Sequence, residues 1–189
     1  MKLVFATNNA HKLEEVRKIL PSTFQIISLA ELGCTEDIEE NGTTLEANSR
    51  IKAEYIWNKY HVDCFADDTG LEIVALNNEP GVYTARWAGE AHNDAANRHK
   101  ALTLLQGITN RAARFRTVVT LIRNGQIQQV YGEVKGQIAT EERGNSGFGY
   151  DPIFMPEGYD KTFAELPANV KNTISHRARA MEALKQILV

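Results

Sequence analysis

The chain has 189 residues, of which 43% are hydrophobic and 24% are charged, and its formal net charge is −3. This length and composition predict one globular domain, residues 1–189, whose core needs no metal or disulfide. A slightly acidic chain is not expected to bind a nucleic acid polymer, and Cys34 and Cys64 form no CxxC pair typical of zinc or disulfide frameworks. Because no apolar run reaches about 18 residues and the N-terminal one ends at Thr7, we expect a cytoplasmic protein without a membrane partner.

Short apolar runs and amphipathic patterns predict the elements of the N-terminal half. In chain order these are a strand at residues 2–6, a helix with Leu13, Val16 and Leu20 on one face, a helix from about Thr44 to Tyr60, a strand at 65–66 that ends at 67–70, a strand over 71–76, and a loop over 77–81. Pro21 closes the first helix, because a proline cannot continue it.

The C-terminal half is predicted in the same way. Its expected elements are a helix from Asp94 to Gln106 with Asp94 as its cap, strands at 115–122 and 127–134, an ordered loop over 143–156, and a helix capped by Ser175 that buries Ala178, Met181, Leu184 and Leu188. The dipeptide Asn124-Gly125 is the strongest short-range signal for a hairpin between the two strands. Strands that alternate with helices around a hairpin predict an α/β domain with a mixed sheet.

The segment from Thr7 to Lys12 lies where a strand is followed by a helix. Backbone N–H groups of the first turn and the helix dipole form an anion site at such a junction. Thr7, Asn9 and Lys12 add side-chain donors and one positive charge, so a triphosphate would fit. The alternative is an ordinary loop capped by Asn9. The sequence contains no GxxxxGK[ST] motif, which excludes the common P-loop.

Two pairs of acids, Glu39-Glu40 and Asp67-Asp68, lie beside small or hydroxyl-bearing turn residues. Mg²⁺ takes oxygen ligands, usually one or two carboxylates plus substrate phosphates, so acids from two elements would suit it. Because neighbouring strand residues point to opposite faces, we expect only one of Asp67 and Asp68 to enter the site and the other to support it. The alternative for Glu39-Glu40 is a solvated loop.

Two later segments carry groups suited to a nucleotide. In residues 147–152, two glycines allow a tight fold around an aromatic residue and an acid, which can stack on a base and bond its edge. A purely structural turn is the alternative. A group of cationic residues lies near the start of the last predicted helix, namely Lys171, His176 and Arg177. Because positive charge at a helix N-terminus is unfavourable for the helix, these residues indicate binding of an external anion or a base carbonyl. For His176, an ordinary surface position stays open.

Two further groups of residues are assigned by their spacing. Asn48 and Lys52 stand at positions i and i+4 of a predicted helix, so they share one face and could reach the same phosphates. Tyr83, Arg86 and Trp87 follow a Pro-Gly turn. We expect these three to serve packing or an interface rather than catalysis.

Taken in order, these motifs resemble those of the inosine triphosphate pyrophosphatase family, whose members remove non-standard purine triphosphates from the nucleotide pool. The match covers nearly the whole chain, and several ordered motifs are far more specific than any one. The matching segments are TNNAHK at 7–12, EENG at 39–42, ADDTGL at 66–71, PGVYTAR at 80–86, GFGYDPIF at 147–154 and KNTISHRARA at 171–180. The resemblance implies an elongated mixed β-sheet flanked by helices, two lobes with a central cleft, and a homodimer.

The resemblance also implies an activity, the Mg²⁺-dependent hydrolysis of ITP, dITP and XTP to the monophosphate and pyrophosphate. Asp68 would be the catalytic acid-base residue and a metal ligand, with Glu39 or Glu40 as the other metal carboxylate. His176 and Arg177 would read the purine and favour a 6-keto group. The implied substrate-binding residues are Thr7, Asn8, Asn9, Ala10, His11, Lys12, Lys52, Thr69, Phe148, Gly149, Tyr150, Asp151, Lys171, His176 and Arg177.

The chain departs from the family pattern at two positions. Asn8 stands where glycine is common, which suggests a left-handed backbone that asparagine tolerates well. Thr69 stands where serine is frequent, and it keeps the hydroxyl.

Two other functions would use the same acidic pairs and lysines, namely a phosphate enzyme acting on standard nucleotides and a nucleotide sensor without turnover. The second acidic pair disfavours the sensor, because binding a polyanion seldom needs it.

Overall fold

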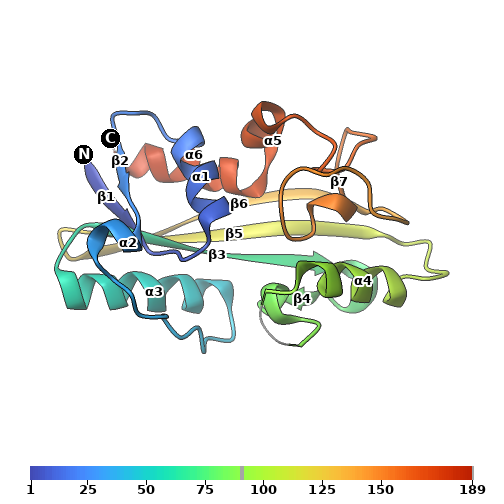
Figure 1. Ribbon diagram of the computed structural model, residues 1–189, viewed down its shortest axis with the longest axis horizontal. Coiled ribbons are helices and arrows are strands. Elements are labelled where there is room, and N and C mark those ends of the chain that lie inside the picture. The colour runs from blue at the N-terminus through green and yellow to red at the C-terminus, as the bar shows by residue number, and fades with distance from the viewer. Residues whose placement is uncertain (90–91, 189) are drawn as a thin grey trace. The chain divides into compact units, whose positions relative to one another are not determined.

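The computed structural model describes residues 1–89 and 92–188 and has an α/β fold on a mixed sheet (Figure 1). Its strands are β1 (Lys2–Phe5), β2 (Gln25–Ile27), β3 (Cys64–Ile73), β4 (Glu79–Gly81), β5 (Ala112–Arg123), β6 (Gln126–Ile138) and β7 (Phe154–Pro156). Their order is β2-β1-β3-β5-β6-β7, with β4 also paired to β3. Strand β1 runs parallel to β2 and β3, whereas β4 and β7 are antiparallel to their partners. The expected mixed α/β fold is confirmed.

Helices and short 3₁₀ segments connect these strands. The helices are α1 (Ala10–Ile19), α2 (Leu29–Leu32), α3 (Leu45–Tyr60), α4 (Asp94–Leu104), α5 (Ala168–Ile174) and α6 (His176–Leu188), and the 3₁₀ segments are Val74–Leu76, Thr84–Arg86 and Asp151–Ile153. The described residues form two compact units. The first contains residues 1–68, 117–132 and α6, and the second contains residues 69–89, 92–116 and 133–175.

In the first unit, alternate strand residues contribute to two cores on opposite faces of the sheet. Leu3, Phe5 and Phe65 pack with α1 and α6, and the rings of Phe5 and Phe65 stack with centroids 4.6 Å apart. Val4 and Ala66 pack with α2 and α3. Figure 1 shows α1 and α6 on one side of these strands and α3 on the other. The alternation therefore decides which helix each later residue of β3 faces.

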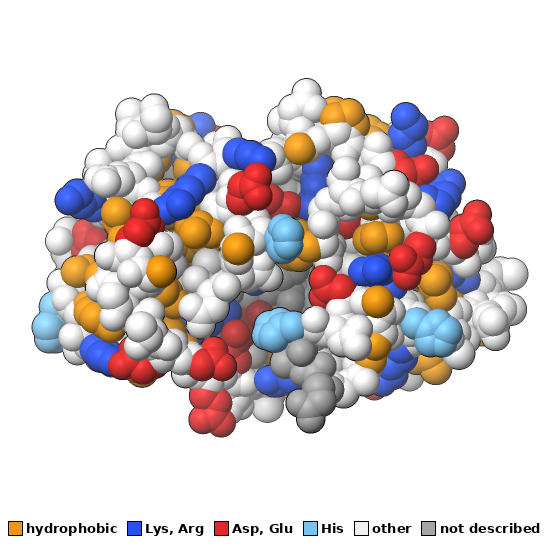
Figure 2. Space-filling model, in the orientation of Figure 1, with side chains coloured by type: hydrophobic (Ala, Val, Ile, Leu, Met, Phe, Trp, Pro, Cys, Tyr) orange, Lys and Arg blue, Asp and Glu red, His pale blue; other side chains and the backbone are white. Residues whose placement is uncertain are grey.

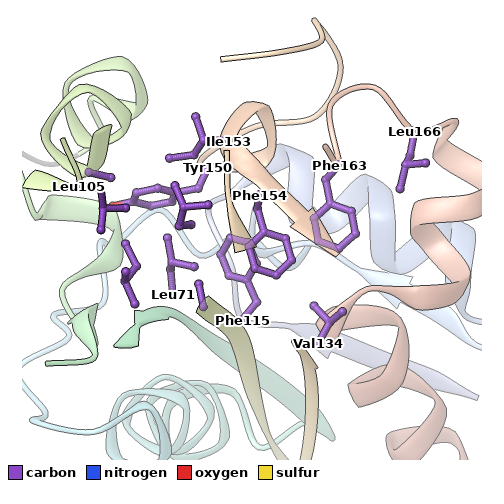
Figure 3. Packing of buried hydrophobic residues seen from close by; sticks show 13 residues of the cluster. Leu71, Leu105, Phe115, Val134, Tyr150, Ile153, Phe154, Phe163 and Leu166 are labelled. Atoms are coloured by element: carbon purple, nitrogen blue, oxygen red, sulfur yellow. The ribbon is translucent and has the colours of Figure 1, made fainter. Parts of the chain in front are cut away.

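The core of the second unit is largely aromatic (Figure 3). The ring centroid of Phe115 lies 4.7 Å from that of Phe154 and 6.5 Å from that of Tyr150, and Phe154 lies 5.2 Å from Phe163. Edge and tilted contacts of this kind stabilise a core beyond the area that they bury. Because Tyr150 belongs both to this core and to the GFGYDP segment, the core anchors that loop.

Local signals in the sequence explain where several elements begin and turn. The Asn9 side chain accepts a hydrogen bond from the Lys12 N–H at 3.1 Å and caps α1, and the Thr44 side chain caps α3. Between β5 and β6, Asn124 and Gly125 have φ of 50° and 77°, which is the left-handed pair that the Asn-Gly signal predicts. The predicted hairpin turn is confirmed, whereas the cap at Asn9 was only the alternative for its segment and the cap at Thr44 was not predicted.

Strand β3 does not end where the sequence suggested. The expected turn at residues 67–70 is wrong, because β3 continues from Cys64 to Ile73. Asp67 and Asp68 stay in the buried strand because cations from other elements compensate their charges. The strand expected up to Leu76 is also wrong at its end, where residues 74–76 form a 3₁₀ segment, and the loop expected over 77–81 contains β4.

Other differences concern helix starts and short elements. Asp94 does not cap α4, because Asn93 does so by accepting a hydrogen bond from the Ala96 N–H at 2.9 Å. The loop expected over 143–156 contains a 3₁₀ segment and β7. Ser175 ends α5, a helix that was not predicted, and α6 follows at once. Strand β2 and helix α2 were also not predicted, since both are too short for a periodic signal.

Charged side chains of both signs are intermixed on the face drawn in Figure 2. Surface ion pairs such as Lys18 with Glu14 and Arg50 with Glu54 link positions i and i+4 of a helix, where such exposed pairs add little to stability. None of the helices in the described ranges is both long and apolar enough to cross a membrane.

Candidate active site

Two neighbouring acids of β3 form the centre of the site in the first unit. Asp67 shares a strand face with Phe65, where α1 and α6 pack, and Asp68 shares the other face with Ala66, where α3 packs. Both side chains are buried, with 0% of Asp67 and 9% of Asp68 exposed. A buried carboxylate is costly unless charged or hydrogen-bonding groups surround it, so the partners of each acid define its role.

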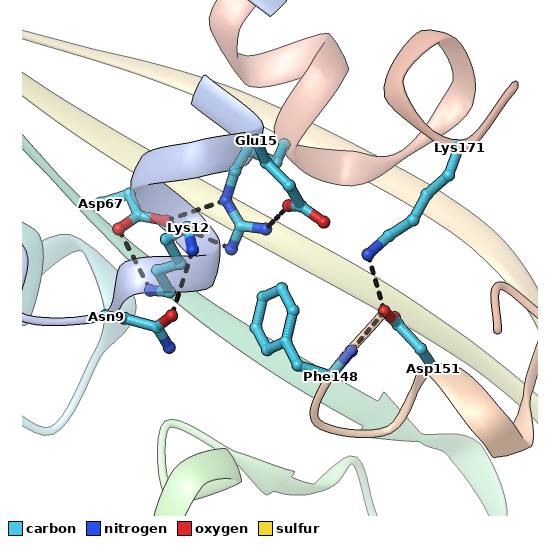
Figure 4. Close-up of polar contacts among 8 residues, drawn as sticks. Asn9, Lys12, Glu15, Asp67, Phe148, Asp151 and Lys171 are labelled. Atoms are coloured by element: carbon cyan, nitrogen blue, oxygen red, sulfur yellow. Dashed lines mark hydrogen bonds and ion pairs between the residues drawn. The ribbon is translucent and has the colours of Figure 1, made fainter. Parts of the chain in front are cut away.

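Asp67 holds two cations, one from α1 and one from α6 (Figure 4). Its Oδ1 lies 3.1 Å from Nζ of Lys12, and its Oδ2 lies 3.4 Å from Nη2 of Arg177. Burial alone would raise the pKa of Asp67, but Lys12 and Arg177 outweigh it and lower that pKa to about 2. Asp67 therefore stays ionised and orients both cations.

Arg177 is held from a second side by Glu15 of α1. Its Nη1 lies 2.5 Å from Oε2 of Glu15, and only 1% of Arg177 is exposed. The sequence analysis missed Glu15, although its position three residues after Lys12 on α1 is a signal that both share a helix face. Asp67 and Glu15 together fix the guanidinium in one orientation.

Asp68 lies among the charges of α3 and of the segment before it. Burial raises the pKa of Asp68 to about 6, with Lys52 and Lys12 opposing that rise and Glu40 adding to it. Oε2 of Glu40 lies 3.1 Å from Nζ of Lys52. Burial alone would lower the pKa of Lys52, but Asp68 and Glu40 raise it. A carboxyl group with a pKa near neutrality can accept and return a proton at physiological pH.

The structure separates the other acidic pair. Glu40 is partly buried and makes the ion pair with Lys52, whereas Glu39 is exposed. Asn48, which shares the α3 face with Lys52, accepts a hydrogen bond from the Gly42 N–H at 2.8 Å through its Oδ1. That bond fixes the turn just after Glu40, so Asn48 positions the acidic segment.

The segment from Thr7 to Lys12 forms the start of α1. Oγ1 of Thr7 accepts a hydrogen bond from the Asn9 N–H at 3.1 Å, and Nδ2 of Asn8 lies 3.5 Å from Oδ1 of Asp37. The left-handed backbone expected at Asn8 is wrong, since Asn8 is not among the described residues with positive φ. The bond from Thr7 closes the turn in a conformation that any residue adopts.

The sequence does not reveal how closely α6 approaches the sheet. A Cβ atom at Gly132 of β6 would lie 2.1 Å from the carbonyl oxygen of His176 and 2.3 Å from the nitrogen of Ala180. Only glycine lets the strand pass this close to the first turn of α6. This approach sets the positions of His176, which is 4% exposed, and of Arg177.

The second unit holds another cluster of predicted site residues (Figure 4). Oδ2 of Asp151 accepts hydrogen bonds from Nζ of Lys171 at 2.6 Å and from the Phe148 N–H at 3.0 Å. The Lys171 ammonium also lies 5.0 Å from the centroid of the Phe148 ring. A Cβ atom at Gly147, whose φ is 77°, would lie 2.1 Å from the same Oδ2. Asp151 thus holds the GFGYDP loop closed and orients Lys171.

The other members of this unit have local roles. The Tyr150 hydroxyl donates a hydrogen bond to the Thr84 carbonyl at 2.7 Å, and burial raises the pKa of Tyr150. Thr69, the residue after Asp68 in β3, is partly buried. Arg86 lies over the Tyr83 ring, with 5.6 Å between the guanidinium carbon and the ring centroid.

The predicted site residues thus gather in two clusters, one in each unit. In the first unit the structure brings together Lys12, Glu40, Lys52, Asp67, Asp68 and Arg177. In the second it brings together Phe148, Asp151 and Lys171. The remaining predicted positions at the start of α1 are partly or fully exposed.

The carboxylates of the first cluster suit a hard divalent cation. No group of three or more His, Cys, Asp or Glu side chains with metal-binding geometry occurs in the part of the chain that the structure describes. Mg²⁺ at a phosphate-binding site needs only one or two carboxylates, since substrate phosphates and water supply the other oxygens. Asp68 and Glu40, both near Lys52, are such oxygen donors.

Comparison with known proteins shows the family to which the chain belongs. The model of the Ham1 family matches residues 3–187. A dITP/XTP pyrophosphatase from Flavobacterium johnsoniae is 51% identical over 100% of this chain and 98% of its own, and one from Bacillus subtilis is 47% identical over 98% and 96%.

Solved structures show the same fold. The Staphylococcus aureus Ham1 protein matches 100% of this chain and 98% of its own with a TM-score of 0.89 and 40% identity, and a HAM1 protein from Coxiella burnetii matches the same shares with a TM-score of 0.90 and 38% identity. The resemblance drawn from the motifs is confirmed. On the strength of a full-length family match and relatives that are about half identical, this chain belongs to the Ham1 family.

Proposed function

We propose that this protein hydrolyses non-standard purine nucleoside triphosphates, namely ITP, dITP and XTP, to the monophosphate and pyrophosphate. The activity named for its full-length relatives supports this proposal. The structural observation that carries it is the difference between two neighbouring acids of β3. Asp67 is ionised among cations, whereas Asp68 has a pKa of about 6. Pyrophosphate release needs both features, a cationic site for phosphates and a group that takes a proton from water.

The phosphates are assigned to the start of α1 and to two lysines. Backbone N–H groups and side chains of residues 7–12 bind the anion at the helix N-terminus, as the positive end of the helix dipole favours. Lys12 is 15% exposed at its side chain and Lys52 is 9% exposed, so their charges act where water is largely excluded. They offset the charge of the departing pyrophosphate.

Asp68 is assigned the role of general base. It accepts a proton from a water molecule while the water oxygen forms a bond to the α-phosphorus. The bond from that phosphorus to the bridging oxygen breaks, and pyrophosphate leaves. Burial supports this role because it raises the pKa of Asp68 toward the working pH, where proton transfer is most effective.

We assign Mg²⁺ as the cofactor and Asp68 and Glu40 as the carboxylates that hold it. When bound, the ion supplies positive charge to the phosphate oxygens. Between the two acids of the 39–40 pair, Glu40 is preferred because it pairs with Lys52, and the charge of Asp68 acts on the same lysine by raising its pKa. The exposed Glu39 stays outside this assignment.

The nucleoside is assigned to the second cluster and to the start of α6. Thr69, residues 148–151 and Lys171 supply substrate contacts, and Phe148 offers an aromatic face to a base. His176 and Arg177 read the 6-keto group, and a site that bonds a carbonyl can reject an analogue without it by about 10⁴-fold. Since guanine also carries a 6-keto group, its 2-amino group must be excluded by shape or by a contact that it leaves unpaired. We further propose that the protein works as a homodimer in the cytoplasm.

The products of ITP hydrolysis test this proposal. ³¹P NMR of a reaction with Mg²⁺ is expected to show IMP and pyrophosphate in equal amounts, with no orthophosphate formed at the same rate. Formation of IDP and orthophosphate would mean attack at the γ-phosphorus and would contradict the assigned reaction.

A further inference from the structure

One residue of the GFGYDP loop is held at both of its backbone polar groups by helix α4. The Gly149 N–H donates to Oδ2 of Asp94 at 2.9 Å, and Nη1 of Arg98 donates to the Gly149 carbonyl at 2.9 Å. Asp94 and Arg98 stand at positions i and i+4, so they project from one face of α4. Nε of Arg98 also lies 3.0 Å from Oε1 of Glu142, which restrains the guanidinium.

The same helix holds the segment that follows the Pro-Gly turn. Asn97, which is 2% exposed, accepts a hydrogen bond from the Ala88 N–H at 2.8 Å and donates to the Ala85 carbonyl at 3.1 Å. Nζ of Lys100 donates to the Trp87 carbonyl at 2.7 Å. Helix α4 is therefore a platform that fixes two loops of the second unit.

The GFGYDP loop needs such restraint. Gly147 and Gly149 have φ of 77° and 61°, and glycine loses more conformational entropy than any other residue when it is fixed. Hydrogen bonds to an ionised partner are about twice as strong as neutral ones, and Gly149 receives one at each backbone group. Asp94 and Arg98 thus offset part of the entropy that the loop loses.

We infer that Asp94 and Arg98 are positioning residues for nucleoside recognition, because they fix the loop that carries Phe148 and Asp151. This inference rests on the proposed function, in which residues 148–151 contact the substrate. Neither residue touches the phosphates in that assignment. Their loss should therefore weaken binding of a nucleoside triphosphate and leave binding of a bare polyphosphate unchanged.

Calorimetry in the presence of chelator tests this separation without turnover. The probes are ITP and inorganic tripolyphosphate, which shares the phosphate chain and lacks the nucleoside. For Asp94→Ala and for Arg98→Ala we expect the Kd of ITP to rise about 10-fold, the usual effect of losing a hydrogen bond to a charged group, and the Kd of tripolyphosphate to stay within about 2-fold. His99→Ala, an exposed position on the same helix, is the matched control.

Conservative variants separate positioning from folding. Asp94→Asn keeps an oxygen that can accept the Gly149 N–H, and Arg98→Lys keeps one donor, so both should recover most of the ITP affinity. An ITP affinity that stays at the wild-type value in both alanine variants would overturn the inference. So would a parallel loss of tripolyphosphate binding, since the whole protein would then be disturbed.

Binding and hydrolysis of ITP by the wild-type protein test the proposed activity independently of the positioning inference. A wild-type protein that binds ITP but does not hydrolyse it would contradict the proposed function and leave the positioning result standing. A wild-type protein that binds tripolyphosphate and not ITP would overturn both, because the loop would then have no nucleoside to recognise.

Discussion

Asp67 and Asp68 are neighbours on β3, and the pKa values of their carboxyl groups shift in opposite directions, to about 2 and about 6. Both are buried, so burial alone would raise both pKa values. The difference arises because the two side chains lie on opposite faces of the strand. Asp67 forms ion pairs with Lys12 and Arg177, whereas the negative charge of Glu40 helps to raise the pKa of Asp68. One acid is fitted to organise cations and the other to exchange a proton.

Replacement of Asp68 tests its role in the reaction. Asp68→Asn removes the proton acceptor and one metal carboxylate without changing the side-chain size. We expect kcat for ITP to fall by about 10² to 10⁴, the usual share of a general base. Steady-state pyrophosphate release measures it, with Asp160→Asn, an exposed carboxylate, as control. Near-normal turnover would remove Asp68 from the role.

The same variant should be more stable than the wild type in chelator at neutral pH. The folded-state pKa of Asp68 is raised from 3.8 to about 6, so the folded protein binds this proton more tightly than the unfolded chain does. The stability from this proton is present below about pH 4 and is lost as the pH rises through 6. At about 1.4 kcal/mol per pKa unit, the shift from 3.8 to about 6 means that Asp68→Asn should gain about 3 kcal/mol at pH 7, or about 6–12 °C in Tm.

Thermal unfolding at pH 4 and pH 7 measures this gain. We expect the two proteins to melt at similar temperatures at pH 4 and the variant to melt higher at pH 7. A gain of equal size at both pH values would mean that it does not come from the ionisation of Asp68.

The equivalent change at the neighbouring acid should have the opposite sign. Asp67→Asn leaves the buried cations Lys12 and Arg177 without their shared carboxylate. Removing one partner of a buried ion pair costs about 3–5 kcal/mol, so we expect Tm to fall by about 10 °C at pH 7. Differential scanning calorimetry of both asparagine variants in one buffer gives the comparison. Equal stabilities would show that the two acids share one environment.

Arg177 is expected to contribute to the choice of base. Arg177→Ala should lower the ratio of kcat/KM for ITP to that for ATP, because the donor that reads the 6-keto group is lost. The ratio is the readout because the buried pairs with Asp67 and Glu15 are also lost, which lowers stability with either substrate. Arg179→Ala on the same helix serves as control. An unchanged ratio would indicate that backbone groups read the base.

The sequence predicted the elements whose signals are local. The helix expected from about Thr44 to Tyr60 spans Leu45–Tyr60, and Asn124-Gly125 forms the expected turn between β5 and β6. The continuity of β3 could not be predicted, because Asp67 and Asp68 resemble a turn when only their neighbours in sequence are considered. The cations that allow Asp67 into a strand lie 55 and 110 residues away along the chain.

The candidate site also combines features with a local signal and features that depend on long-range packing. Strand alternation predicted that only one of Asp67 and Asp68 would enter the site and that the other would support it, and this stays a prediction. Which partner each acid meets depends on the packing of α1, α3 and α6, which the sequence does not state. The close approach of Gly132 to α6 could not be predicted either, because a glycine in a strand has several explanations.

Pyrophosphate release from ITP, XTP, ATP and GTP, each with Mg²⁺ and with chelator, tests the central claim most directly. We predict fast, Mg²⁺-dependent release from ITP and XTP, and rates at least about 100-fold lower from ATP and GTP, in keeping with discrimination by bonds to the base. Equal rates on all four substrates would instead make the protein a general nucleotide pyrophosphatase, and release from none of them would leave a binding protein without this activity.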